Sequence, residues 1–138
     1  MAEGLCLAHL AQQLSCKDVD DLMGMGYSVC SAGTMGLAGA QASAGAIMAC
    51  AERGIDLSHH RSSMLTGPLL QESDLIFVME RAHLDQVLSI RPEAADHCWP
   101  LDPDGDIADP VGQSEAHYRQ CCARIEQAIR HRMSELVL

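Results

Sequence analysis

At 138 residues the chain is long enough to bury the core of one domain. Hydrophobic residues make up 48% of it but aromatic residues only 3%, so the core must consist of aliphatic side chains, methionine and alanine. The formal net charge of −10 excludes a surface that attracts phosphate backbones, and no apolar run nears the roughly 20 residues that cross a bilayer. The start has no basic lead-in of a signal peptide. We expect a single domain over residues 1–138, cytoplasmic, with neither nucleic acid nor membrane as partner.

The first half of the chain predicts two helices and a strand. An apolar stripe through Met1, Leu5 and Ala8 indicates a helix over residues 1–14. Residues 15–26 predict a loop or a short helical turn. Residues 27–33, "YSVCSAG", predict a buried strand that ends at glycine. Another loop is expected at 36–42. Helix 43–53 then follows, capped by its first serine and ended by Gly54.

The second half alternates helices with apolar runs. Thr66 is predicted to cap a short helix with Pro68 in its first turn. Five consecutive apolar residues in 74–80 indicate a strand buried on both faces of a parallel sheet. A helix over 81–90 and a weak strand at 97–99 follow. The last helix, 114–138, carries an apolar face made by Tyr118, Cys121, Cys122, Ile125, Ile129 and Met133. This alternation predicts an α/β fold with a mostly parallel sheet.

The cysteines indicate thiols in a reducing compartment. There are seven, an odd number, and no Cys-x-x-Cys pair occurs, which argues against a disulfide framework and a zinc site. Cys6, Cys30 and Cys50 stand in apolar sequence, where buried thiols behave as small hydrophobes. We expect no metal and no cofactor. The most clustered candidate metal ligands do not have the spacing of a tetrahedral site; they are His59, His60, His97 and Cys98.

Taken together, several stretches resemble the low-molecular-weight protein tyrosine phosphatase family, at sensible spacings over the whole chain. The resemblance implies a three-layer α/β fold with helices on both sides of the sheet. The forms "HRSSMLT" and "DP-x-G" are similar to the bacterial branch that includes protein-arginine phosphatases. The stretches that carry the resemblance are "MAEGL" at 1–5, "SAGTMGLAG" at 31–39, "GIDLSHHRSSMLT" at 54–66, "SDLIFVM" at 73–79 and "DIADPVG" at 106–112.

The resemblance implies a role for Asp109. In such phosphatases a cysteine thiolate takes the phosphoryl group, and a carboxylic acid gives the leaving group its proton. Asp109 matches that acid, and Pro110 fixes the backbone after it. Without the resemblance, the local sequence favours a turn residue or the cap of the next helix at Asp109 over a general acid. Asp106 is the weaker candidate. His60 and Ser31 match positions that support the phosphate-binding loop, although a hydrogen-bonded histidine explains His60 as well.

The other half of such a site is missing from the sequence. The chemistry needs a cysteine followed six positions later by an arginine, which binds two phosphate oxygens. The residues six positions after the seven cysteines are Gln12, Leu22, Gly36, Asp56, Asp104, Gln127 and Ala128, so the signature does not occur. In relatives the loop runs directly into a helix that begins "MAE". We therefore expect a chain truncated at its N-terminus, without the first, central strand, and inactive in this form.

Three interpretations remain open. The first is a protein phosphatase for phosphotyrosine or phosphoarginine, whose partner is a phosphorylated protein or a small phosphate monoester. The second is a non-catalytic phosphatase-like module that binds through the remaining cleft or the open sheet edge, where self-association is also possible. The third is an arsenate-reductase-like relative. Adjacent Cys121 and Cys122 favour core packing over a thiol relay. In relatives an aromatic residue often follows the Asp-Pro pair, whereas Val111 stands here.

Overall fold

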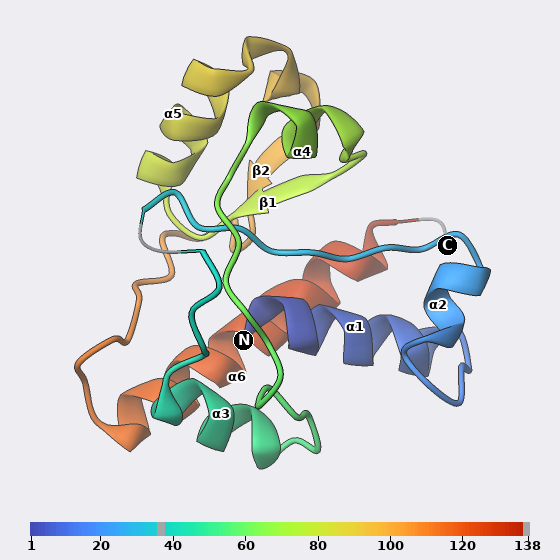
Figure 1. Ribbon diagram of the computed structural model, residues 1–138, viewed down its shortest axis with the longest axis vertical. Coiled ribbons are helices and arrows are strands. Elements are labelled where there is room, and N and C mark those ends of the chain that lie inside the picture. Colours follow the sequence, from blue (N-terminus) through green and yellow to red (C-terminus); the bar gives the residue numbers. More distant parts are fainter. Residues whose placement is uncertain (36–37, 137–138) are drawn as a thin grey trace.

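The computed structural model describes residues 1–35 and 38–136. Two short parallel strands and a set of helices make up its regular structure (Figure 1). In chain order these elements are α1 (Ala2–Gln13), α2 (Asp21–Gly24), α3 (Ala44–Ala51), α4 (Gly67–Glu72), β1 (Ile76–Val78), α5 (Arg81–Ile90), the 3-10 helix η1 (Pro92–His97), β2 (Cys98–Pro100) and α6 (Glu115–Ser134).

The two strands form the centre of the upper part of the molecule in Figure 1. They pair in parallel, with Phe77 opposite Trp99. Side chains alternate along β1, because successive residues of a strand point to opposite faces. Val78 is buried among residues of α4, α5 and η1, whereas Phe77 and Met79 pack against the larger core formed by the other helices. The predicted burial of the run at 74–80 on both faces is confirmed only in part: β1 packs on each face, but Val78 is its one buried residue, Leu75 before it is exposed, and the strand is shorter.

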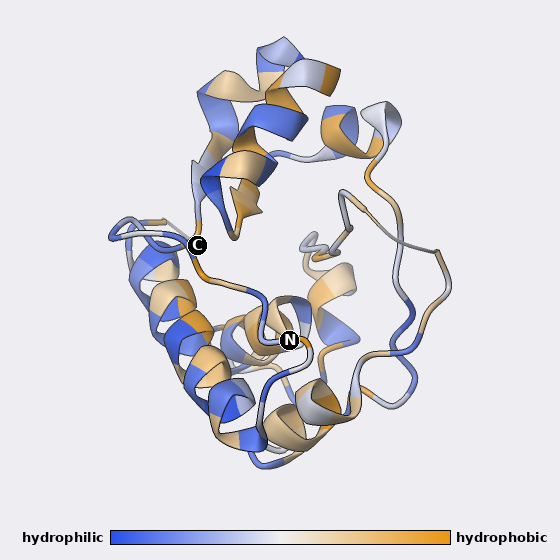
Figure 2. Ribbon diagram, turned by 90° about the vertical axis from the view of Figure 1, so that its left-hand side faces the viewer, coloured by the Kyte–Doolittle hydropathy of each residue, from blue (hydrophilic) through white to orange (hydrophobic). Residues whose placement is uncertain are grey.

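The larger core lies where α1, α3 and α6 meet in the lower part of the molecule (Figures 1 and 2). Tyr118 of α6 lies against Gly45 of α3, and the absent side chain of this glycine permits the close approach of the two helices. Arg119 of α6 also pairs with Glu52 at the end of α3, with Nη2 2.9 Å from Oε1. The buried members of this core are Leu5, Leu10, Ala11, Leu22, Ala46, Ala49, Cys50, Leu57, Leu101, Ile107, Tyr118, Cys122, Ile125, Ala128, Ile129 and Met133.

Arg132 joins α6 to the end of the sheet. Its Nε donates to the carbonyl of Leu101 at 3.1 Å and its Nη2 to the carbonyl of Pro100 at 2.5 Å. The guanidinium also lies 5.7 Å from the centre of the Phe77 ring, within the range of a cation–π contact. The chain leaves β2 from this anchored position and runs through residues 101–113 to α6 (Figure 1).

The predicted helix boundaries are largely confirmed. Ser43, Thr66 and Ser114 each accept a backbone N–H from three residues ahead and cap α3, α4 and α6. Helix α5 has the predicted bounds, and the weak strand is β2, displaced by one residue. Helix α3 ends at Ala51, two residues early, and Gly54 follows with a φ of 74°. Helix α6 ends at Ser134, four residues before the predicted end at 138. Residues 36–37 and 137–138 lie outside the described residues.

The predicted strand at 27–33 is wrong. Tyr27 and Val29 do pack against the larger core, which explains the strand-like pattern. A strand also needs a neighbour for its backbone groups, and within the described residues no backbone hydrogen bond is made by residues 28–32. The segment crosses the molecule as a drawn-out coil (Figure 1), and the one bridge it forms with described residues is the isolated pair Gly33 and Met64. The predicted α/β alternation therefore holds, with two strands in the sheet.

Two smaller expectations also need correction. Cys30 is exposed, because it stands on the outer side of the extended segment whose inner side carries Val29. The buried side of α1 consists of Leu5, Leu10 and Ala11. The predicted apolar stripe, which included Ala8, therefore faces a different direction around the helix. Over the part of the chain that the structure describes, no helix is both long and apolar enough to cross a membrane.

Candidate active site

Asp109 lies in the loop that connects β2 to α6. Its side chain is exposed, while the following Pro110 is buried and holds the loop against the protein. Oδ1 of Asp109 accepts the backbone N–H of Val111 at 3.0 Å, which forms a local Asx turn. The cap of α6 is Ser114 and not Asp109. The structure thus shows Asp109 as an exposed turn residue.

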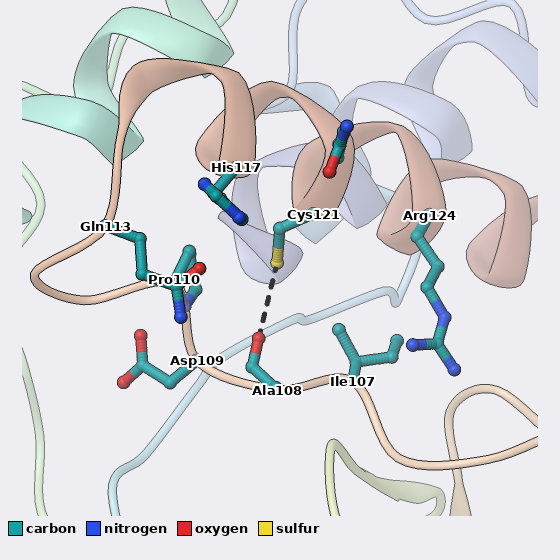
Figure 3. Close-up of a pocket in the computed structure, with 9 residues that line it drawn as sticks. Ile107, Ala108, Asp109, Pro110, Gln113, His117, Cys121 and Arg124 are labelled. Carbon is teal, nitrogen blue, oxygen red and sulfur yellow. Dashed lines mark hydrogen bonds between the residues drawn. The ribbon is translucent and has the colours of Figure 1, made fainter.

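A pocket of about 230 Å³ separates this loop from α6. In Figure 3 the Asp109 carboxyl lies at one end of the pocket and the Arg124 guanidinium at the other. Between them, the Cys121 thiol faces the carbonyl of Ala108 at 3.8 Å. His117 also lines the pocket from α6, with Nδ1 2.7 Å from Oγ of Ser114. The general-acid candidate therefore lies at the edge of a pocket with both polar and apolar walls.

Arg124 is already occupied by other contacts. Its Nε donates to Oδ2 of Asp102 at 2.8 Å, and its Nη2 donates to the carbonyl of Gly105 at 3.2 Å. Backbone donation from Asp104, followed by the contact with Arg124, lowers the pKa of the Asp102 carboxyl. These bonds fix the loop that leads to Asp109. A phosphate would have to compete with them for the guanidinium, so Arg124 does not replace the arginine of the missing signature.

The pKa shifts of four thiols make them poor candidates for a nucleophile. Burial raises the pKa of Cys6 and of Cys50 to about 11, and Cys122 beside Cys50 adds to the second shift. Burial also raises the pKa of Cys98. For Cys121 the cause is again burial first, followed by the negative charge of Asp109. A thiolate is the attacking species in such chemistry, so these four groups are poorly suited to it.

Ser31 and His60 come together at a residue that the sequence did not single out. Oε2 of Glu3 accepts a hydrogen bond from Oγ of Ser31 at 2.5 Å and lies 3.7 Å from Nδ1 of His60. Glu3 stands in the first turn of α1, where a negative charge is favourable. The only feature of the sequence that could have indicated Glu3 is its position, as an acidic residue in the first turn of a predicted helix. Separately, the described residues contain no group of three or more side chains suited to hold a metal ion.

Comparison with known proteins places the whole chain in one family. The model of the low molecular weight phosphotyrosine protein phosphatases matches residues 2–137. A probable low molecular weight protein-tyrosine-phosphatase, EpsP of Ralstonia nicotianae, is 32% identical over 127 residues, which cover 91% of this chain and 84% of EpsP. The protein-arginine-phosphatase of Geobacillus stearothermophilus is 35% identical over 109 residues, covering 75% and 73%.

Solved structures agree with this assignment. The tyrosine phosphatase Wzb of Vibrio vulnificus, in complex with benzylphosphonate, has a TM-score of 0.81 at 27% identity and covers 98% of this chain and 88% of its own. The YwlE arginine phosphatase of Geobacillus stearothermophilus has a TM-score of 0.79 at 28% identity, covering 97% and 81%. The chain belongs to the low molecular weight phosphotyrosine protein phosphatase family and has its α/β fold. Tyrosine and arginine phosphatases both stand among its relatives.

Proposed function

We propose that Asp109 is the general acid of a site for dephosphorylating phosphotyrosine or phosphoarginine in proteins. In the proposed reaction a cysteine thiolate attacks phosphorus, the bond from phosphorus to the phenolic oxygen or guanidinium nitrogen breaks, and Asp109 protonates that atom. Water then hydrolyses the phosphocysteine. The observation that carries the proposal is the family match over residues 2–137, combined with the exposed carboxyl of Asp109 in the matching "DP-x-G" segment.

We further propose that residues 1–138 alone are catalytically inactive. No cysteine among them is followed six positions later by arginine, so they supply neither the nucleophile nor the phosphate-binding guanidinium that the family chemistry needs. Purified protein of this sequence should hydrolyse p-nitrophenyl phosphate and a phosphoarginine peptide no faster than buffer does. Steady turnover that disappears in an Asp109→Asn variant would contradict the inactivity and would support the acid role.

A hybrid protein tests the acid role directly. The strand and Cys-x5-Arg loop of the Geobacillus stearothermophilus arginine phosphatase would be joined in front of Met1. We expect the hybrid to turn over phenyl phosphate, and Asp109→Asn to lower kcat by roughly 10²- to 10⁴-fold, because phenolate is a poor leaving group without a proton donor. The loss should be smaller with p-nitrophenyl phosphate, whose leaving group needs less assistance. Asp104→Asn, in the same loop, is the matched control and should keep its kcat. An active hybrid indifferent to Asp109→Asn contradicts the proposal.

The supporting residues have a defined place in this proposal. Glu3 connects Ser31 and His60 at the first turn of α1, so the pair would brace a phosphate-binding loop that precedes that helix. In the same hybrid, Ser31→Ala or His60→Ala should raise the KM for phosphate esters more than it lowers kcat. Pro110→Ala should lower kcat, because a freer backbone leaves the Asp109 carboxyl less well directed.

One observation favours a second candidate, a non-catalytic binding module. Residues 28–32 belong to no helix or strand, and within the described part of the chain no backbone hydrogen bond is made by them. Such a row of open donors and acceptors can pair with an added strand from another chain. Concentration-dependent self-association in sedimentation experiments, together with an inactive hybrid, would favour this function over the enzyme.

A further inference from the structure

Asp106 contacts the start of a helix that lies far away in the sequence. Its Oδ1 accepts the backbone N–H of Arg81, the first residue of α5, at 2.9 Å. The residue before it, Glu80, makes no side-chain cap of its own. The first N–H groups of a helix have no partner within the helix, and negative charge is favourable there. Asp106 thus supplies the cap that the local sequence of α5 lacks.

A second contact fastens the same loop to the sheet. The backbone N–H of Ile107 donates to the carbonyl of Met79, just beyond β1, at 2.9 Å. The Ile107 side chain is buried in the larger core. Asp106 and Ile107 therefore hold the loop near the carboxyl end of β1, shortly before Asp109. After Asp109 the loop is held by Pro110, which is buried.

We propose that Asp106 is a positioning residue for Asp109, which acts through the amide of Arg81 and does not itself transfer a proton. The inference rests on the proposed role of Asp109 as general acid. Losing one of the two tethers lets the loop move away from the end of β1 and carries the Asp109 carboxyl with it. The competing interpretation is that Asp106 stabilises α5 and has no effect on the loop.

Two substitutions remove the same hydrogen bond from opposite sides. Asp106→Ala deletes the acceptor. Arg81→Pro deletes the donor, and proline suits the first position of a helix because the N–H it lacks has no helical partner. Glu80 has φ −132° and ψ 152°, the extended conformation that proline requires of the residue before it. Asp106→Asn keeps an acceptor oxygen and serves as the conservative variant. Asp104→Ala removes a neighbouring exposed charge and is the matched control.

Amide hydrogen exchange, followed by NMR on the 138-residue protein, separates the two interpretations. The amide of Ile107 reports the tether, and the amide of Val111 reports the turn that holds Asp109. In Asp106→Ala and in Arg81→Pro we expect both amides to exchange roughly fivefold faster or more, the effect of losing one cap. Asp106→Asn and Asp104→Ala should leave these rates close to those of the unsubstituted protein.

Faster exchange confined to amides of α5 would show that Asp106 is a helix cap alone and would overturn the inference. If Asp106→Ala does not fold, Arg81→Pro decides the matter, since it leaves the charge of the loop intact. Amide exchange rates report the geometry of the loop and do not depend on catalytic activity. A hybrid enzyme indifferent to Asp109→Asn would therefore disprove the acid role, whereas unchanged exchange at Ile107 and Val111 would disprove the positioning role.

Discussion

Ser31 donates a hydrogen bond to Glu3 across 2.5 Å, from Oγ to Oε2, although the two residues are 28 positions apart. The same carboxylate oxygen lies 3.7 Å from Nδ1 of His60. One side chain in the first turn of α1 therefore connects the extended segment that contains Ser31 with the segment that leads towards β1. The start of α1 is fixed by contacts from two separate parts of the chain.

A double-mutant cycle should detect the bond between Glu3 and Ser31. We expect Glu3→Gln and Ser31→Ala each to lower the free energy of unfolding by about 1 kcal/mol, a charge-assisted bond weakened by partial exposure to solvent. The double variant should lose less than the sum, with a coupling energy of about 1 kcal/mol. Urea denaturation measures these values. Ser28→Ala, in the same extended segment, is the control and should be additive with Glu3→Gln. Additivity of Ser31→Ala would show that the bond contributes nothing.

Gly45 should not tolerate even one added methyl group. A Cβ at this position would clash with Cδ2 of the Tyr118 ring, closer than real atoms approach. The ring is buried between α3 and α6, so we expect Gly45→Ala to cost about 1–3 kcal/mol of stability by overpacking. Thermal unfolding checks this. Gly24→Ala is the matched control, because nothing lies within 4 Å of its added Cβ. Equal melting temperatures of the two variants would mean that α3 and α6 pack less closely.

Features determined by nearby residues were predictable from the sequence. Ser43 caps α3 through an amide only three positions ahead, and the proline after α5 limits that helix from its own neighbourhood. The cluster at Glu3 was not predictable, because it joins three distant segments and its members carry no pattern that pairs them. The same holds for Asp106, whose partner amide is 25 positions away.

The error at 27–33 has a related cause. The alternation of Tyr27 and Val29 with exposed residues is what a strand on a core surface requires, and their burial follows it. Whether such a segment becomes a strand depends on a neighbour that offers backbone groups at the right spacing. No periodicity within seven residues contains that information. For Asp109 the residue and its loop were predictable from the sequence, while its hydrogen bond with the amide of Val111 and its place in a pocket shared with Arg124 needed the structure.

Stability should fall in mildly alkaline solution because of the buried thiols. Burial raises the pKa of Cys6 and Cys50 from 9.0 to about 11. Below pH 9 both states keep these protons and the contribution to stability is complete. As the pH rises from 9 towards 11 the unfolded chain releases protons that the folded protein retains, so stability falls and the contribution is lost above 11.

Urea midpoints measured under reducing conditions at about pH 8 and about pH 10 test this slope. The unsubstituted protein should lose stability between the two values, and Cys6→Ala should lose less. Cys30→Ala is the control, because Cys30 is exposed and its removal should leave the slope unchanged. A slope that Cys6→Ala does not reduce would assign the alkaline loss to other groups.

The backbone of residues 28–32 should exchange its amide hydrogens faster than any helix of the protein. Tyr27 donates to the carbonyl of Leu22 and Gly33 to that of Ser63, at 2.9 and 2.8 Å, but within the described residues the amides between them have no acceptor. An amide that needs no local opening exchanges its hydrogen at a rate close to that in an unfolded peptide. We expect these amides to exchange within a few-fold of peptide rates in dilute protein, whereas amides near Ile125 in α6 should be protected.

Repeating the measurement over a range of protein concentrations distinguishes the two candidate functions. Rates that stay fast at every concentration would mean that the open backbone row attracts no second copy. Protection of residues 28–32 that grows with concentration would show strand pairing between copies, in support of the binding-module function. The amide of Leu65, which donates to the carbonyl of Gly33 at 2.9 Å, is an internal control and should be equally protected throughout. Strong protection of residues 28–32 in the most dilute sample would contradict the prediction, because it would require partners within the same chain.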